Sequence, residues 1–309
     1  MPTLLFTHPA CIAHDPSPRH PEAPARLKSV LAALEDERFA LLDRREAPLA
    51  ERAWIARVHP MAFVEAVLAA VPREGYAAID ADTVMSPGSG EAALRAAGAV
   101  VAAVDAVAAG EADNAFCAVR PPGHHAEPGR AMGFCLFNNV AVGALHAREA
   151  HGHRRVAVVD FDVHHGNGTQ AMFEADPDLF YASTHQMPLY PGTGDASETG
   201  VAGNIVNVPL PPGAGTVQFR AAMQRTVLPA LDAFDPDFLL ISAGFDAHAA
   251  DPLANLRLAT EDFAWATTEL LAVARRRCGG RVVSTLEGGY DLGALGKASA
   301  AHVHALMTG

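Results

Sequence analysis

The sequence is poor in cysteine and has no long hydrophobic run free of charge. Its four cysteines form no C-x-x-C pair, and they are Cys11, Cys117, Cys135 and Cys278. We therefore predict reduced core cysteines in a reducing compartment. The apolar segment from Ala92 to Ala109 is interrupted by Arg95 and Asp105, which favours a buried helix over a membrane span.

Positive charge is also scarce, because 23 Lys and Arg residues stand against 35 Asp and Glu residues and the net charge is −12. An acidic protein repels phosphate backbones, so this balance disfavours tight nonspecific binding to nucleic acid. A cationic peptide or polyamine suits it as a substrate. Residues Met1 to Thr7 lack a basic region followed by a long apolar stretch, so we predict no signal peptide, no membrane partner and a cytoplasmic location.

Several catalytic motifs are missing as well. The sequence contains no G-x-S-x-G, no H-E-x-x-H and no P-loop, which leaves a serine hydrolase, a zincin or an NTPase without support. It has no internal repeat, and its Pro/Gly clusters are short and evenly spread. Because half of the 309 residues are apolar, the chain can bury one large core, and we predict a single domain over residues 1–309.

Short apolar runs alternate with helical segments along the chain. The predicted strands are Thr3–Thr7, Ala115–Val119, Val156–Phe161, Leu179–Ser183, Phe238–Ser242 and Val282–Leu286. The predicted helices are Ala23–Glu37, Pro60–Val71, Glu91–Ala109, Asn139–Glu149, Thr216–Phe234, Thr260–Arg276 and Leu292–Met307. This alternation predicts an α/β layer fold with a mainly parallel sheet, in which ligands bind beyond the carboxyl ends of the strands.

Four of the predicted strands end in polar, glycine-containing turns. These turns are residues 120–126, 160–166, 243–248 and 287–291, and each carries side chains that can bind a metal or transfer a proton. Because the carboxyl ends of parallel strands lie at one edge of a sheet, we expect the four turns to form one site.

One of these turns carries closely spaced acidic groups. Asp160, Asp162 and His164 are spaced by two, so on an extended chain they share one face. Carboxylates that end an apolar strand cost several kcal/mol to bury unless a cation neutralises them. The alternative is one carboxylate capping a helix and one in solvent, and the other three turns disfavour it.

A second turn supplies a third ligand, Asp246. We assign Asp162, His164 and Asp246 to one divalent cation, with a fourth position left open for water and substrate, as in catalytic zinc sites. These oxygen and nitrogen ligands also suit Fe²⁺, Co²⁺ or Mn²⁺.

The remaining turns offer acid/base groups. His124 and His125 follow a rigid Pro-Pro-Gly segment, and Asp160 and Asn167 are available to orient them. Histidines with unlike partners can divide general-base and general-acid work. Tyr290 follows two glycines, and its phenol can donate a hydrogen bond to a developing oxyanion. Taken alone, the histidine pair would be surface residues and the tyrosine a packed loop residue.

These residues belong to motifs that resemble the histone deacetylase family, especially class II enzymes and their bacterial homologues. The similarity covers nearly the whole chain and is carried by residues 19–27, 120–126, 133–139, 159–169, 190–195, 242–246, 251–253 and 287–290. The resemblance implies the arginase/deacetylase fold, a single α/β domain with an eight-stranded parallel sheet. It agrees with the three metal ligands and with Tyr290.

The resemblance also implies further site residues. Phe134 and Tyr190, with Gly133 and Leu253, would line a narrow tunnel around the lysine methylenes. Arg26 would lie near the exit path for acetate. Asp82 would contact the substrate backbone at the rim of the tunnel. A structural K⁺ is implied near a set of five residues, partly through backbone carbonyls, namely Asp160, Asp162, His164, Ser183 and Thr184.

Three positions refine the comparison. Asn167 stands where class I enzymes carry Asp, which favours the class II-like subgroup. Tyr190 replaces the commoner Phe and adds a hydroxyl to the tunnel wall. Leu253 occupies the position where the polyamine-selective eukaryotic member carries Glu, which favours acyl-lysine over acetylpolyamine.

We therefore hypothesise a zinc-dependent amidohydrolase that removes acetyl or other acyl groups from the ε-amine of lysine through a metal-activated water. His124 and His125 accept and return the proton, with His125 serving the leaving amine, while the metal and Tyr290 stabilise the oxyanion. The rivals are an acetylpolyamine amidohydrolase, a two-manganese ureohydrolase and an inactive acyl-ligand binding protein. The acyl length, natural substrate and oligomeric state stay open.

Overall fold

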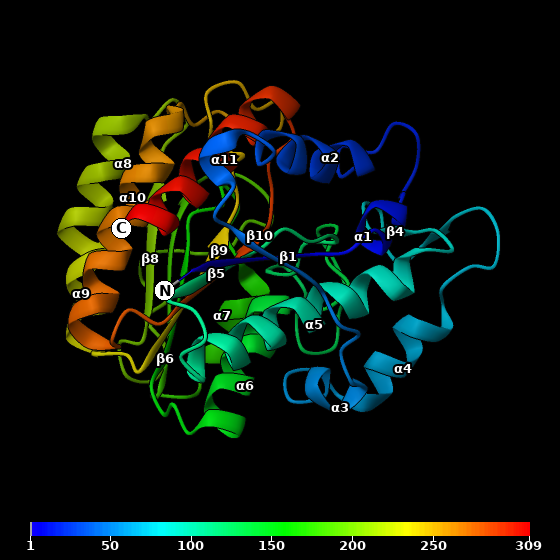
Figure 1. The fold of residues 1–309 in the computed structure, drawn as a ribbon, viewed down its shortest axis with the longest axis horizontal. Coiled ribbons are helices and arrows are strands. Elements are labelled where there is room, and N and C mark those ends of the chain that lie inside the picture. Colours follow the sequence, from blue (N-terminus) through cyan, green and yellow to red (C-terminus); the bar gives the residue numbers. More distant parts are fainter. Residues whose placement is uncertain (1) are drawn as a thin grey trace.

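A computed structural model describes residues 2–309 and shows an eight-stranded sheet between two layers of helices (Figure 1). The sheet strands are β1 (Thr3–Thr7), β2 (Asp43–Glu46), β5 (Asn114–Cys117), β6 (Val156–Asp160), β7 (Leu179–Gln186), β8 (Ile205–Leu210), β9 (Phe238–Ala243) and β10 (Val282–Leu286). Their order is β2-β1-β5-β10-β9-β6-β7-β8, and every pair is parallel. The predicted fold class is confirmed. The predicted domain spans residues 1–309, so its first residue lies outside the described part.

The helices cover both faces of this sheet. They are α1 (Ala10–Ala13), α2 (Pro24–Ala33), α3 (Arg52–Ile55), α4 (Met61–Ala69), α5 (Ser89–Ala108), α6 (Asn139–His151), α7 (Asn167–Phe173), α8 (Thr216–Ala222), α9 (Leu228–Phe234), α10 (Thr260–Arg277) and α11 (Leu292–Thr308). Helices α5, α6 and α7 lie on one face, and α8 to α11 lie on the other (Figure 1). A 3₁₀ turn (Glu37–Phe39) and a small hairpin of β3 (Ala77–Ala78) and β4 (Val84–Met85) complete the structure.

The six predicted strands are present, with small shifts at their ends. The prediction missed β2 and β8, which are the two edges of the sheet. The sequence of β2 is Asp-Arg-Arg-Glu, and it has no apolar alternation because one side of an edge strand faces solvent. Strand β8 contains Pro209, which lacks an N–H and is tolerated only where no neighbouring strand needs it.

The predicted helix over Thr216–Phe234 is interrupted in its middle. A π-helical segment, Met223–Val227, joins α8 to α9. Pro229 lies in the first turn of α9, and its missing N–H removes one bond of an uninterrupted α-helical ladder. The wider hydrogen-bond spacing of the π segment accommodates this loss.

The inner strands β5, β6, β9 and β10 are buried along their whole lengths. Helices cover them from both sides, which explains why their sequences are continuous apolar runs rather than alternating ones. The Ala-rich segment predicted as a buried helix forms α5, and most of its residues are buried. Among residues 2–309 no helix is long and apolar enough to cross a membrane.

The sheet order also brings the polar turns together. The strands that precede them, β5, β10, β9 and β6, are consecutive neighbours in the sheet. Their carboxyl ends therefore lie side by side along one edge, where α/β sheets bind ligands. This adjacency positions the site described below.

Gly98 marks the closest approach between α5 and the segment after β2. A Cβ atom there would overlap the carbonyl oxygen of Pro48 and lie 2.8 Å from the Ala50 nitrogen. We expect Gly98→Ala to lower the free energy of unfolding by about 1–3 kcal/mol, because the two backbones must separate. Urea denaturation measures this change.

Gly293→Ala on α11 is the matched control. Its Cβ atom would meet only the Asp291 carboxylate, at 3.5 Å, and alanine is the better helix former, so this variant should gain about 0.4–1 kcal/mol. A Gly98→Ala protein as stable as the wild type would contradict the close packing.

Candidate metal centre and active site

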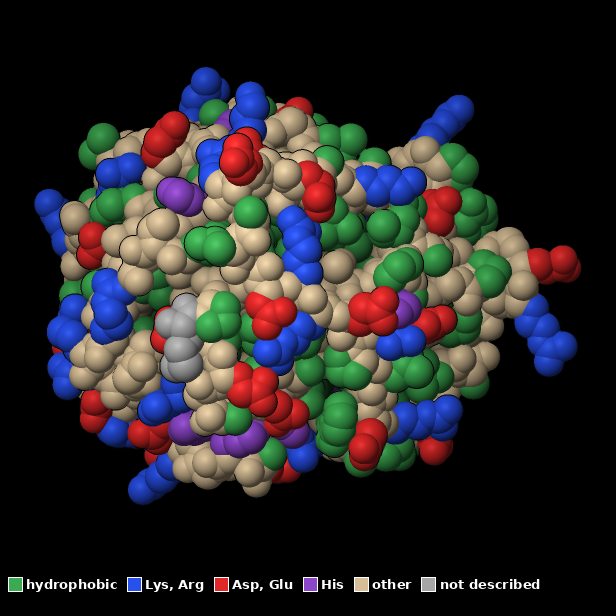
Figure 2. Space-filling model, viewed as in Figure 1, with side chains coloured by type: hydrophobic (Ala, Val, Ile, Leu, Met, Phe, Trp, Pro, Cys, Tyr) green, Lys and Arg blue, Asp and Glu red, His purple; other side chains and the backbone are tan. Residues whose placement is uncertain are grey.

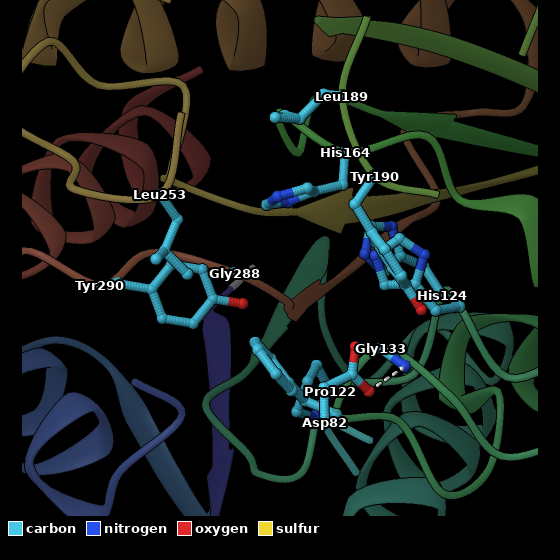
Figure 3. Close-up of a pocket in the computed structure, with 12 residues that line it drawn as sticks. Asp82, Pro122, His124, Gly133, His164, Leu189, Tyr190, Leu253, Gly288 and Tyr290 are labelled. Atoms are coloured by element: carbon cyan, nitrogen blue, oxygen red, sulfur yellow. Dashed lines mark hydrogen bonds between the residues drawn. The ribbon is translucent and has the colours of Figure 1, made fainter. Parts of the chain in front are cut away.

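A cavity of about 250 Å³ opens at the carboxyl ends of the inner strands. It is lined by Asp82, Pro122, His124, His125, Gly133, Phe134, His164, Leu189, Tyr190, Leu253, Gly288 and Tyr290. The labelled side chains surround one central space, and the Tyr290 hydroxyl is directed into it (Figure 3). The cavity has apolar walls and polar groups at a few points, which is typical of a small-molecule or side-chain binding site.

The three predicted metal ligands converge beneath this cavity. Ligand atoms of Asp162, His164 and Asp246 all lie within 4.8 Å of one another, and all three residues are buried. The Nδ1 atom of His164 lies 3.1 Å from Asp162 Oδ1 and 3.1 Å from Asp246 Oδ2. An imidazole nitrogen between two carboxylate oxygens is a donor set that a divalent cation accepts.

The local backbone differs from the prediction. Strand β6 ends at Asp160, and the residues that follow form bends rather than an extended chain. The Asp162 N–H donates to Asp160 Oδ1 (3.0 Å), and the His164 N–H donates to Asp162 Oδ1 (2.9 Å). The expectation that an extended strand aligns the three side chains is therefore wrong. Each aspartate instead accepts a hydrogen bond from the N–H group two residues later, which forms a turn. These turns bring Asp162 and His164 to the site.

The electrostatics of the cluster fit a divalent cation. Burial, reinforced by the neighbouring Asp162 carboxylate, raises the pKa of Asp246 to about 7. Burial alone would lower the pKa of His164, but Asp162 and Asp246 raise it to about 10. Two buried carboxylates thus hold one proton on the imidazole between them. A bound cation would supply that positive charge directly.

Gly288 keeps the cluster compact. Its N–H donates to Asp162 Oδ2 at 2.8 Å, and a Cβ atom there would overlap the Asp246 carboxylate. Only glycine allows the turn after β10 to approach both ligands. The sequence suggested that this glycine lets the backbone direct Tyr290 toward the site, and the structure adds its close approach to Asp162 and Asp246.

A second group of possible ligands lies on the surface, where Figure 2 shows histidines gathered at the lower edge near α6. Asp105, His146 and His151 form this group. Asp105 Oδ1 accepts from Nε2 of both histidines at 2.7 Å, and Arg57 Nη1 donates to His146 Nδ1 at 2.5 Å. His146 therefore carries its proton on Nε2 and offers the cluster no lone pair. Within residues 2–309 no arginine donates to His164 in the buried group.

The tandem histidines have the partners that the sequence suggested. His124 Nδ1 lies 2.9 Å from Asp160 Oδ2, and His125 Nδ1 lies 2.8 Å from Asn167 Oδ1. Burial would lower the pKa of His124, but Asp160 and Asp162 raise it to about 10. Burial and the neighbouring His124 hold the pKa of His125 well below its usual range. The two imidazoles therefore differ in charge.

Two residues that sequence reasoning did not assign support this pair. Glu287 is fully buried, and its Oε2 accepts from the N–H groups of Gly123 (2.6 Å) and His124 (3.1 Å). The Tyr181 hydroxyl donates to Asp160 Oδ2 at 3.2 Å. Both contacts join segments far apart in the chain, so no local pattern could reveal them.

Tyr290 lies opposite the histidines, in the turn after β10. Its N–H donates to Asp251 Oδ2 at 2.7 Å, and its ring lies 4.8 Å from the guanidinium carbon of Arg26. Burial raises the pKa of the Tyr290 phenol well above its usual range, so the group stays a proton donor. Arg26 itself is fully buried, bonds the Gly289 carbonyl (2.5 Å), and lies behind Tyr290 rather than in the cavity lining.

The residues expected around a potassium ion lie on β7 and at or just after the end of β6. Ser183 on β7 is the sheet partner of Asp160 on β6, and its hydroxyl bonds His185 Nδ1 at 2.9 Å. The Thr184 hydroxyl is buried and has no hydrogen-bond partner within residues 2–309. The potassium site stays a prediction.

The expected tunnel residues line the cavity. Phe134, Tyr190 and Leu253 form part of its wall, and Gly133 and Asp82 lie beside Phe134. A Cβ atom at Gly133 would come within 2.5 Å of the His125 ring, so glycine is required there. The Asp82 carboxylate accepts from the Gly133 N–H at 3.2 Å (Figure 3).

The chain is similar to known proteins in sequence and in fold. The sequence profile of the histone deacetylase domain matches residues 20–306. A histone deacetylase-like amidohydrolase of Pseudomonas aeruginosa is 45% identical over 92% of this chain and 74% of its own length. A probable deacetylase of Archaeoglobus fulgidus is 39% identical over 94% and 82%. The crystal structure of the HDA15 HD domain has a TM-score of 0.94 at 36% identity, covering 99% of this chain and 89% of that chain.

The two candidate metal clusters can be separated by one pair of variants. We expect Asp246→Ala to lose bound zinc, because it removes one of three ligands from a buried site. Asp105→Ala, which removes the shared carboxylate of the surface cluster, should retain one zinc per chain. Elemental analysis after dialysis measures both, with circular dichroism to verify folding. Zinc kept by Asp246→Ala and lost by Asp105→Ala would reverse the assignment.

Proposed function

The chain belongs to the histone deacetylase family, and from that membership we propose that it is a zinc-dependent amidohydrolase that removes acetyl or other acyl groups from lysine ε-amines. We propose that residues 1–309 act as one catalytic domain in the cytoplasm. The observation that carries the function is the convergence of Asp162, His164 and Asp246 below a cavity that also holds Tyr290. Fe²⁺ or Co²⁺ would satisfy the same ligands.

The cavity supports an acylated aliphatic amine as substrate. Phe134, Tyr190 and Leu253 supply apolar surface for a chain of methylenes, and the polar groups lie where an amide would reach. The net charge of −12 attracts a cationic peptide. An acyl-lysine side chain combines these features, because it carries four methylenes between the peptide backbone and the amide.

His125 supplies the proton transfers, and His124 supplies a positive charge beside it. A cation bound by the three ligands would polarise the acyl carbonyl and lower the pKa of a water. His125 is neutral, and its Nδ1 faces the Asn167 carbonyl, so its proton sits on Nδ1 and its Nε2 is free to accept the water's proton. The same Nε2 then delivers a proton to the leaving amine. His124, charged beside Asp160, stabilises negative charge as it develops.

Tyr290 completes the set as a hydrogen-bond donor to the oxyanion. We expect Tyr290→Phe to lower kcat by roughly 10²–10³, because one oxyanion donor is removed and the metal ligands are untouched. KM for an acetyl-lysine peptide should change little, and zinc content should stay at the wild-type level. Measured turnover equal to the wild type would remove Tyr290 from the mechanism.

Two rivals lose support from the site. A two-manganese ureohydrolase needs additional ligands beside Asp246, but both ring nitrogens of His248 are bonded elsewhere, to the Ala250 N–H (3.1 Å) and the Thr260 hydroxyl (3.3 Å). An inactive binding protein would have no use for the paired histidines and the buried phenol. An acetylpolyamine amidohydrolase remains the second candidate, because the cavity also accommodates its substrate.

The choice between lysine and polyamine substrates depends on Leu253, an apolar residue in the cavity wall. We expect a higher kcat/KM for acetyl-lysine peptides than for acetylputrescine. Leu253→Glu should raise kcat/KM for acetylputrescine by roughly ten-fold, because it adds a partner for the distal ammonium. Leu253→Gln, which has the same size and no charge, is the matched control. Preference of the wild type for acetylputrescine would favour the second candidate.

A further inference from the structure

The wall residue Phe134 is held in an unusual backbone conformation. Gly133 and Phe134 are the central residues of a tight turn in which Met132 and Cys135 exchange hydrogen bonds of 3.1 and 2.9 Å. Both central residues have positive φ, 56° and 68°, which is characteristic of a type I′ hairpin turn. A phenylalanine rarely adopts this conformation, because its Cβ atom crowds the backbone. Something outside the turn must therefore hold it.

The turn leaves two N–H groups without partners of its own, those of Gly133 and Phe134. Neighbouring residues of a distant segment accept both bonds. The Gly133 N–H donates to Asp82 Oδ1 (3.2 Å), and the Phe134 N–H donates to the Thr83 hydroxyl oxygen (3.1 Å). The Thr83 hydroxyl donates in turn to Asp82 Oδ1 (2.9 Å). Asp82 and Thr83 thus accept hydrogen bonds from both free N–H groups of the turn, which would otherwise lack partners.

Thr83 is itself fixed in place. It immediately precedes β4, and its side chain and backbone are only 1% exposed. Its N–H donates to Asp80 Oδ1 at 2.9 Å, and its carbonyl accepts from the Ile79 N–H at 2.8 Å. The hydroxyl therefore presents a rigid acceptor to Phe134. The small β3–β4 hairpin thus contacts the Phe134 turn through this hydroxyl as well as through Asp82.

We propose that Thr83 is a positioning residue that sets the tunnel wall by holding Phe134 in its left-handed conformation. The inference rests on the proposed function, because it assigns Phe134 to the grip on the substrate chain. The Phe134 ring makes edge contacts with Tyr290 (5.9 Å between centroids) and with His20 (4.7 Å). Release of the Phe134 N–H would let the turn relax and move this ring relative to Tyr290.

Thr83 allows a cleaner test than Asp82. Asp82 lines the cavity, so replacing it would change a surface that a substrate contacts. Thr83 is not among the cavity-lining residues, and valine has nearly its shape. Thr83→Val therefore keeps the side-chain volume and removes the acceptor for Phe134, together with the bond that the hydroxyl donates to Asp82. Thr83→Ser keeps the hydroxyl and removes only a methyl group.

Two hydroxamates distinguish the wall from the metal. Acetohydroxamate reaches the metal alone, and a linear alkyl hydroxamate with an aromatic cap also fills the tunnel. In the zinc-loaded full chain, we expect Thr83→Val to weaken the long hydroxamate roughly five- to ten-fold, the effect of one lost hydrogen bond. Its affinity for acetohydroxamate should match the wild type, and Thr83→Ser should restore the affinity for the long probe. KM for acetyl-lysine peptides should rise more than kcat falls.

A double-mutant cycle tests whether Thr83 acts through Phe134. If it does, Thr83→Val should add little to the loss caused by Phe134→Ala, because the ring that it positions is already gone. Thr267→Val is the matched control. Thr267 is also buried, and its hydroxyl bonds the Phe263 carbonyl and His302, away from the cavity. This control should leave both affinities unchanged.

Each other outcome contradicts the inference. Equal loss of both hydroxamates in Thr83→Val would place the damage at the metal, and unchanged affinity for the long probe would show that the turn needs no clamp. Additive effects of Thr83→Val and Phe134→Ala would separate the two residues. A wild-type protein that binds neither hydroxamate would overturn the proposed function and this inference together. Wild-type binding of both hydroxamates without the expected loss in Thr83→Val would overturn this inference alone.

Discussion

The structure depends on the burial of two carboxylates, Asp162 and Asp246, on either side of one imidazole at the end of a parallel sheet. Acidic groups so placed repel each other and lose their hydration, so a folded chain keeps them only if positive charge lies between them. His164 provides a single charge when protonated. A divalent cation provides two and leaves the imidazole neutral. A cation bound there would therefore stabilise the folded chain as well as supply chemistry.

The residues around His124 and His125 give these two histidines different properties. His124 and His125 are adjacent in the chain, yet a carboxylate faces one and an amide faces the other. Asp160 is anchored by Tyr181, and the backbone of His124 is anchored by Glu287. Asp160 raises the pKa of His124, whereas burial and the neighbouring His124 hold the pKa of His125 well below its usual range. The difference between the two pKa values therefore comes from the surroundings rather than from the histidines themselves.

Glycines and a strained turn bring the chain close to the site. At Gly288 a side chain would strike the Asp246 carboxylate, and at Gly133 it would strike His125. Phe134 adopts positive φ without being glycine, and its cost is offset by hydrogen bonds from the β3–β4 hairpin. The conformation of this wall therefore depends on side-chain acceptors that a distant segment supplies to its backbone.

The sequence by itself determined the α/β class, the inner strands and the grouping of metal-binding and acid/base residues after four of them. The apolar runs and the polar turns that follow them are local features of the sequence. Because the strands are parallel, their carboxyl ends lie at one edge of the sheet. The local patterns did not predict the edge strands β2 and β8, because these strands are partly exposed to solvent. They also did not predict the backbone after Asp160, where aspartate side chains accept hydrogen bonds from the chain and form turns. Only the tertiary structure decided the roles of Glu287, Tyr181 and Thr83, because their hydrogen bonds join segments from 15 to 164 residues apart, and no local pattern records such a distance.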